Sequence, residues 1–135
     1  MNSRSIFYLF FISMILIPAS SVAATINDSY HILFGEWKNT NENTQGITRI
    51  TFINNDNGVI VKTFGRCVPT ECELEDTYLV TKDGAPLEIF YEEPLFTMTL
   101  EPVLLASSVL QVKITKHFFD ANATIKEKTI FLNKQ

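Results

Sequence analysis

The sequence contains few of the residues that most often carry catalytic or metal chemistry. It has two cysteines and two histidines, and its five glycines are dispersed, so no glycine-rich phosphate loop occurs. His31 and His117 have no metal-site or triad spacing, and the G-x-S-x-G nucleophile motif is missing. These absences favour a protein that is not an enzyme and that has no cofactor and no metal. A pair of carboxylates for glycoside chemistry stays open, since its separation is spatial.

Basic residues are also scarce, and they are scattered along the chain. Eleven Lys and Arg residues stand against fifteen Asp and Glu residues, for a net charge of −4. Nucleic-acid binding draws its affinity from clustered Lys and Arg side chains. The composition therefore argues against a nucleic-acid partner, and the ordinary meaning of the acidic excess is solubility.

One long hydrophobic run occurs, Ile6 to Ile17, and it is shorter than the roughly 20 residues that a membrane-spanning helix needs. Arg4 precedes it and small residues follow it up to Ala24, which is the order of a secretory signal peptide. The pattern predicts that residues 1–24 are a signal peptide and residues 25–135 a single domain with no membrane span. The domain is then expected in the periplasm or outside the cell. A retained membrane anchor is the alternative.

Helical periodicity is missing after this segment, and short apolar runs take its place. The runs are rich in Val, Ile, Thr, Phe and Tyr and are bounded by turn residues, which is typical of β-strands. Eight strands are predicted: Ile32–Lys38, Gly46–Asn54, Val59–Gly65, Leu74–Lys82, Leu87–Glu92, Leu95–Glu101, Val109–Phe118 and Ile125–Asn133.

The connections between these runs predict an antiparallel meander. Asn55–Gly58 and Asp83–Gly84 are typical of tight hairpins, and Pro94 separates two further runs. Within the runs, apolar and polar residues alternate, which indicates a sheet with one buried face. We therefore expect an all-β domain that closes into an eight-stranded barrel, with a two-sheet β-sandwich as the alternative. Such a barrel is filled by its own side chains or holds one small ligand.

The two cysteines, Cys67 and Cys72, lie in a turn-like segment. In an exported chain, this spacing favours a disulfide, because oxidising compartments stabilise the bond. A ring this small stabilises a protein by only about 2 kcal/mol, so the bond would mainly fix one loop. A redox pair usually has two intervening residues, and a zinc site needs four ligands, so both alternatives are weaker.

Three ordered segments resemble a known group of proteins: Gly35–Asn39 (GEWKN), Thr44–Ile50 (TQGITRI) and Gly65–Cys72 (GRCVPTEC). They are similar to the G-x-W-x-N, T-x-G-I-T-R-I and W-G-x-C-x-P-T-x-C blocks of small exported bacterial proteins, most of them of unknown function. The chain departs from this pattern at Phe64, where a tryptophan is usual, and after Cys72, where Glu-Leu replaces a common Asp-Trp pair. A G-x-W on the first strand is similar to lipocalin and avidin-like barrels, by analogy of fold alone.

Residues in and beside these blocks are the candidates for binding: Trp37, Arg49, Phe64, Arg66, Pro69 and Thr70. Trp37, the single tryptophan, is expected to plug one end of the barrel, and the alternative is a wall of a ligand pocket. The leading hypothesis is a binding module for a small apolar ligand or for a component of the envelope or the extracellular space. The second hypothesis is an inhibitor of an extracellular protease or lysozyme, with residues 25–31 as the inserted segment.

Overall fold

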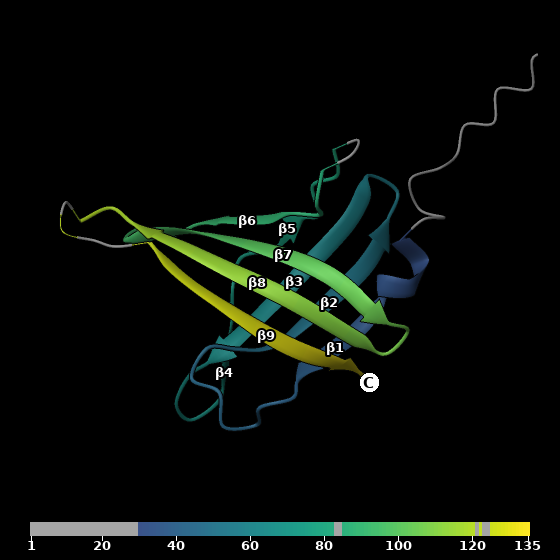
Figure 1. Ribbon diagram of the computed structural model, residues 1–135, viewed down its shortest axis with the longest axis horizontal. Helices are drawn as coiled ribbons and strands as arrows, with labels where there is room; N and C mark the ends of the chain where they lie inside the picture. The colour runs from purple at the N-terminus through teal and green to yellow at the C-terminus, as the bar shows by residue number, and fades with distance from the viewer. Residues whose placement is uncertain (1–29, 83–84, 121, 123–124) are drawn as a thin grey trace, which may run out of the picture.

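The protein, seen in a computed structural model, is described for residues 30–82, 85–120, 122 and 125–135. These residues form one antiparallel β-sheet with almost no helix (Figure 1). The predicted signal peptide and the predicted hairpin at Asp83–Gly84 lie outside the described residues. The all-β antiparallel meander is confirmed.

Nine strands follow a single turn of 3-10 helix, η1 (His31–Leu33). A tight connection joins β2 to β3 at Asn55–Gly58, as its turn residues predict, and another joins β7 to β8 after Ala106. The strands are β1 (Gly35–Asn39), β2 (Ile47–Asn55), β3 (Gly58–Arg66), β4 (Glu71–Glu73), β5 (Thr77–Tyr78), β6 (Ile89–Glu92), β7 (Phe96–Ala106), β8 (Val109–Phe118) and β9 (Lys126–Lys134).

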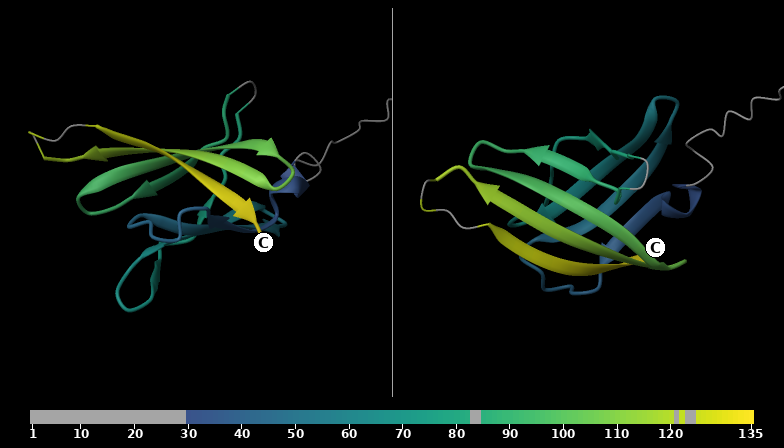
Figure 2. Two further views of the ribbon diagram at one scale, coloured as in Figure 1. Left: turned by 60° about the horizontal axis from the view of Figure 1, so that its bottom comes forward. Right: turned by 45° about the horizontal axis from the view of Figure 1, so that its top comes forward.

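The first and last strands join the two halves of the sheet. The strand order is β4-β3-β2-β1-β9-β8-β7-β6, and β5 pairs with β3 outside this path. Trp37 on β1 lies opposite Ile50 of β2 on one side and Lys134 of β9 on the other. Figure 2 shows the result as two layers, with β6 to β9 facing β1 to β3.

The curved sheet is an open half-barrel. At one end, the segment that follows β5 links the two layers: the Leu79 amide donates to the Val59 carbonyl (2.9 Å), and Val80 forms a bridge with Glu88. At the other end, the described residues of β4 and β6 form no strand pair. Neither the closed eight-stranded barrel nor the β-sandwich is confirmed.

Two predicted strands need correction. Ile32 and Leu33 of the predicted strand Ile32–Lys38 belong to η1, and β1 begins only at Gly35, whose φ is +114°. The run predicted as Leu74–Lys82 has only two strand residues, Thr77 and Tyr78. This segment leaves β3 to cross toward β6, so it cannot keep one neighbour along its whole length, and regular pairing needs such a neighbour.

Strand β7 is longer than predicted because it continues through Pro102, which lies opposite Val112 of β8. Proline cannot donate a backbone hydrogen bond, so it is tolerated where a strand has no partner on one side. Strand β6 pairs with β7 only from the pair Glu92–Thr97 to the pair Ile89–Leu100, so it has no residue opposite Pro102. The missing N–H therefore costs no bond between β7 and β6.

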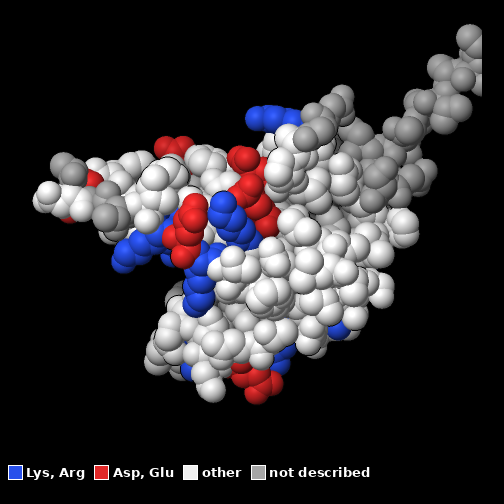
Figure 3. All heavy atoms as spheres, in the orientation of Figure 1, with Lys and Arg blue, Asp and Glu red and all other residues white. Residues whose placement is uncertain are grey.

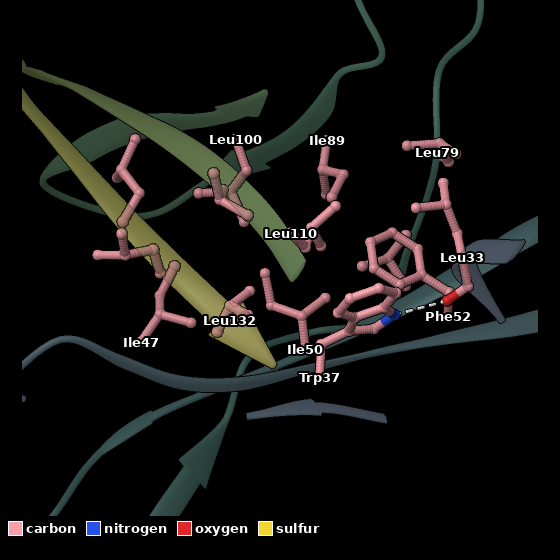
Figure 4. Close-up of a cluster of buried hydrophobic side chains, with 14 of the residues drawn as sticks. Leu33, Trp37, Ile47, Ile50, Phe52, Leu79, Ile89, Leu100, Leu110 and Leu132 are labelled. Atoms are coloured by element: carbon pink, nitrogen blue, oxygen red, sulfur yellow. Dashed lines mark hydrogen bonds between the residues drawn. The ribbon is translucent and has the colours of Figure 1, made fainter. Parts of the chain in front are cut away.

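The core fills the space between the layers at the end where η1 lies. Trp37, Ile50, Leu110 and Leu132 are fully buried there, and their side chains converge from both layers (Figure 4). The Trp37 indole Nε1 donates to the Leu33 carbonyl oxygen at 2.7 Å, so its one polar atom is satisfied. Trp37 and η1 thus close this end of the half-barrel, which we call the filled end.

Candidate functional site

A cavity of about 900 Å³ occupies the opposite end of the half-barrel, which we call the open end. Its floor is apolar: Ile47, Met98 and Ile114 are buried, and Leu74 and Phe96 are half-buried beside them. The volume lies in the range of about 300–1,000 Å³ that is typical of small-molecule sites. The same inward face that is filled near Trp37 therefore surrounds an accessible space here.

The strands β8 and β9 form a basic wall of this cavity. On β8, Leu110, Val112 and Ile114 point into the core, and with a period of two the next inward position is Lys116. On β9, Leu132 and Ile130 are buried, and the same alternation continues to Lys128 and Lys126. All three lysines line the cavity, and we call Lys116, Lys126 and Lys128 the lysine wall.

Two aromatic rings lie among these lysines. The ring centroids of Phe96 and Phe118 are 5.5 Å apart, and the two residues face each other across β7 and β8. Lys116 Nζ lies 4.7 Å from the Phe96 ring centroid, and Lys126 Nζ lies 5.4 Å from the Phe118 centroid. Both distances are within cation–π range, so the rings help to hold the ammonium groups at the cavity mouth.

The side of the cavity opposite the lysine wall is acidic. Glu92 and Glu93 at the end of β6 line it together with Glu75, which follows β4. Among the described residues, neither these three acids nor the three lysines form an ion pair. Three more charged residues line the cavity: Glu73 and Glu127, which form ion pairs with Lys62 and Lys113, and Arg66 on β3. The cavity is therefore polarised, with unpaired lysines on β8 and β9 and mainly negative charge across from them.

Charge is also distributed unevenly on the outside of this region. Figure 3 shows one face, on which basic and acidic side chains gather over the part of β7 to β9 that leads away from the C-terminus. The other half of that face is mostly uncharged. The charged part is the open end of the half-barrel, where β8 ends and β9 begins.

A buried hydrogen bond marks the boundary between the filled and open ends. The Tyr91 hydroxyl on β6 donates to Thr63 Oγ1 on β3 at 2.7 Å, which connects the two layers across the unpaired gap. Burial raises the pKa of the Tyr91 phenol above its usual value, and the hydrogen bond with Thr63 partly opposes the shift. The phenol therefore stays neutral at physiological pH.

The predicted disulfide is present, and it shapes a second, shallower hollow. Cys67 and Cys72 are bonded, with Cα atoms 5.5 Å apart, and the loop between them projects from the sheet (Figure 2). A groove of about 410 Å³ lies between this loop and the polar loop after β1. Arg66, Pro69 and Thr70, three of the predicted binding residues, line it together.

Arg49 and Phe64, two further predicted residues, meet on the outer face of the sheet. The Arg49 guanidinium carbon lies 3.5 Å from the Phe64 ring centroid. Its Nε donates to Glu71 Oε2 at 2.8 Å, and its Nη1 donates to Glu36 Oε2 at 3.2 Å. The Arg49 hydrogen bond lowers the pKa of the Glu71 carboxyl below its usual value. This contact ties the short strand β4 to β1 and β2, so it has a clear structural use.

The three sequence blocks that carry the resemblance are neighbours in space. Asn39 Nδ2 donates to the Ile47 carbonyl at 2.7 Å, which links the first block to the second. The Arg66 amide donates to the Gly46 carbonyl at 2.9 Å, which links the second block to the third. These contacts hold both loops of the groove in place.

Trp37 lies apart from the other predicted binding residues, since it is fully buried at the filled end and lines neither hollow. The lysine wall, by contrast, was not among the predicted residues. Its signal was present in the period-two alternation, which runs on from Ile114 to Lys116 and back from Ile130 to Lys128. Alternation alone shows that a side chain points inward, and it does not show that a cavity lies there.

Within the described part of the chain, no group of three or more His, Cys, Asp and Glu residues could hold a metal ion. In the same residues there is no helix with the length and apolar character needed to cross a bilayer. Comparison with models of protein families, with curated proteins and with solved structures found no match to this chain.

Proposed function

We propose that the protein is an exported, non-enzymatic binding module that takes up a small apolar ligand at the open end of the half-barrel. The observation that carries this proposal is the cavity of about 900 Å³ with Ile47, Met98 and Ile114 as its floor. Burying apolar surface is favourable by about 25 cal/mol per Å², so an accessible apolar floor favours an apolar occupant. The Cys67–Cys72 disulfide fits a periplasmic or secreted location, because oxidising compartments favour the bond.

A pair of matched variants tests the ligand site. The chain is expressed in full, purified from the periplasm, and titrated with an uncharged apolar fluorophore such as Nile red. Leu74→Glu places a carboxylate on the cavity wall, whereas Leu95→Glu makes the same change at a side chain that is 74% exposed and does not line the cavity.

We expect Leu74→Glu to weaken binding of the fluorophore at least about tenfold, because a charge on an apolar wall must be desolvated. Leu95→Glu should bind like the parent chain, and both should keep its circular dichroism spectrum. Absence of saturable binding to the parent chain, or equal effects of the two variants, would overturn the proposal.

Recognition of a protein, as by an inhibitor of an extracellular protease or lysozyme, is the second candidate. It is favoured by the projecting Cys67–Cys72 loop, in which the Val68 side chain is 92% exposed. The predicted inserted arm, residues 25–31, lies outside the described residues except for Tyr30 and His31. Affinity capture from an envelope and secreted fraction tests this candidate. A partner lost with Val68→Asp but kept with Leu105→Asp, a control at another exposed apolar residue, would support it, and recovery of no protein would reject it.

A further inference from the structure

The lysine wall differs from two lysines on the outer face of the sheet, Lys62 and Lys113. Lys62 forms ion pairs with Glu73 and Asp76, and Lys113 with Glu101 and Glu127, so both of these outer-face lysines have two carboxylate partners. Among the described residues, no carboxylate forms an ion pair with Lys116, Lys126 or Lys128. Their positive charge is therefore available at the cavity mouth.

The position of the lysine wall brings like charges together. Lys116 on β8 lies directly opposite Lys126 on β9. The next pair on the same face of the sheet is Ile114 and Lys128, so Lys128 lies beside the first two lysines. Like charges directly opposite each other destabilise a strand pair, and an anion placed between them would relieve the repulsion. A group of lysines that carries this cost and forms no ion pair with a described carboxylate is suited to binding an anionic group.

The apolar floor indicates that the ligand also has an apolar part. Ile114 and Met98 lie directly behind the lysine wall on the inner face, and Lys116 lies opposite Met98 across β7 and β8. A ligand that reaches both must carry its charge at one end and an apolar body behind it. The Phe96 and Phe118 rings lie at the junction between the two regions.

The acidic side of the cavity limits how much negative charge the ligand can carry. Glu75, Glu92 and Glu93 would repel a polyanion that filled the mouth, whereas a single head group at the lysine wall is kept on the other side. An amphiphile with one anionic group can contact the lysine wall with that group and the apolar floor with its chain, and it places no negative charge beside the glutamates.

We propose that the cavity at the open end binds a single-headed anionic amphiphile, with its apolar chain on the floor and its head group at Lys116, Lys126 and Lys128. This inference rests on the proposed ligand site and names the class of ligand for it. The head group is a carboxylate or a phosphate, because both accept hydrogen bonds from ammonium groups.

A matched series of ligands tests the charge requirement. Isothermal titration compares dodecanoate, dodecyl phosphate, dodecanol and dodecyltrimethylammonium, each below the concentration at which it forms micelles. We expect both anions to bind at least about tenfold more tightly than dodecanol, and the cation to bind most weakly. The ratio of the two anions then identifies the carboxylate or the phosphate as the preferred head group.

Variants of the lysine wall test where the head group binds. Lys116→Gln/Lys126→Gln should reduce dodecanoate affinity at least about tenfold and leave dodecanol affinity within about twofold. Unchanged dodecanol binding also shows that the cavity of the variant is intact. Lys113→Gln, which changes a lysine on the outer face of the same strand, is the control and should bind both ligands like the parent chain.

The outcomes separate this inference from the proposed function. Equal binding of dodecanoate and dodecanol, or tighter binding of the cation, would overturn the inference that the ligand has an anionic head group. The proposed apolar ligand site would not be affected by either result. Loss of dodecanoate affinity in Lys113→Gln but not in the double variant would also overturn it. No binding of any member of the series would reject the apolar ligand site and this inference together.

Discussion

The two ends of the half-barrel are built from the same strands, yet one is filled and the other is not. At the filled end, the inward positions of β8 and β9 are Leu110 and Leu132, which pack against Trp37 and are fully buried. At the open end, the same inward alternation places Lys116 and Lys126 beside a cavity. An inward position on this sheet is therefore a core position only where the opposite layer and a large side chain cover it.

The largest expected effect is the removal of the indole that closes the filled end. Trp37→Ala should lower the free energy of unfolding by about 3–5 kcal/mol, because a large side chain is deleted from a close-packed site. Urea denaturation measures the loss. Trp37→Phe, a smaller change, should retain the fold and still lose stability, since Phe cannot donate to the Leu33 carbonyl.

Phe96→Ala at the open end is the matched comparison for this change. Phe96 is half-buried and lines the cavity, so its truncation should cost about 1–2 kcal/mol, which is less than the loss at Trp37. Equal losses at the two sites would contradict the contrast between a filled and an open end.

The next effect concerns the disulfide loop near the open end. Cys67→Ser/Cys72→Ser should lower the free energy of unfolding by about 2 kcal/mol, because the ring that the bond closes is small. In hydrogen exchange, the backbone amides of β4 should lose protection, and those of β8 and β9 should keep it. A loss of protection throughout the sheet would show that the bond supports more than one loop. Thiol labelling of the denatured parent chain should succeed only after reduction.

The hydrogen bond at the boundary between the two ends is the third test. Tyr91→Phe should cost about 1 kcal/mol, because it removes the bond and leaves Thr63 Oγ1 buried without this partner. Adding Thr63→Val should recover part of the loss, since both polar atoms are then gone. Thermal unfolding measures both steps, and additive losses in the double variant would mean that the two side chains act independently.

The smallest expected effect is a pH-dependent one on the outer face. The Arg49 hydrogen bond lowers the pKa of Glu71, so the pair stabilises the fold above the ordinary carboxyl pKa of 4.5 and loses this effect as the pH falls through the lowered value. Glu71→Gln should therefore cost less than about 1 kcal/mol at neutral pH, because both side chains are partly exposed. Denaturation at neutral and at acidic pH checks this, and a difference from the parent that persists at low pH would contradict it.

Most strands could be predicted because their signals are local. The alternation in Val109–Phe118 corresponds to β8, and the polar turn Asn55–Gly58 joins β2 to β3. The prediction of a full strand at Leu74–Lys82 was wrong. The composition of this segment is typical of a strand, but the segment has no single neighbouring strand along its whole length. Pairing of such a segment depends on residues that are distant in the chain, such as Val59 and Glu88.

The candidate sites could be predicted in part. Arg66, Pro69 and Thr70 meet in one groove because the disulfide confines them to one loop, which is a local effect. The pairing of Arg49 with both Glu36 and Glu71 could not be read from the sequence, since it joins three strands. The lysine wall was missed for the same reason, because the space beside it depends on the opposite layer.

The strand-rich character of the chain, the turn at Asn55–Gly58 and the cysteine pair follow from the sequence, because backbone preference and alternation act within a few residues. Three features depend on the folded structure: the sheet is an open half-barrel, Trp37 closes one end, and Lys116 lies beside a cavity at the other. The physical reason is that a cavity is set by the separation of two layers. That separation depends on packing between strands that are far apart in the sequence.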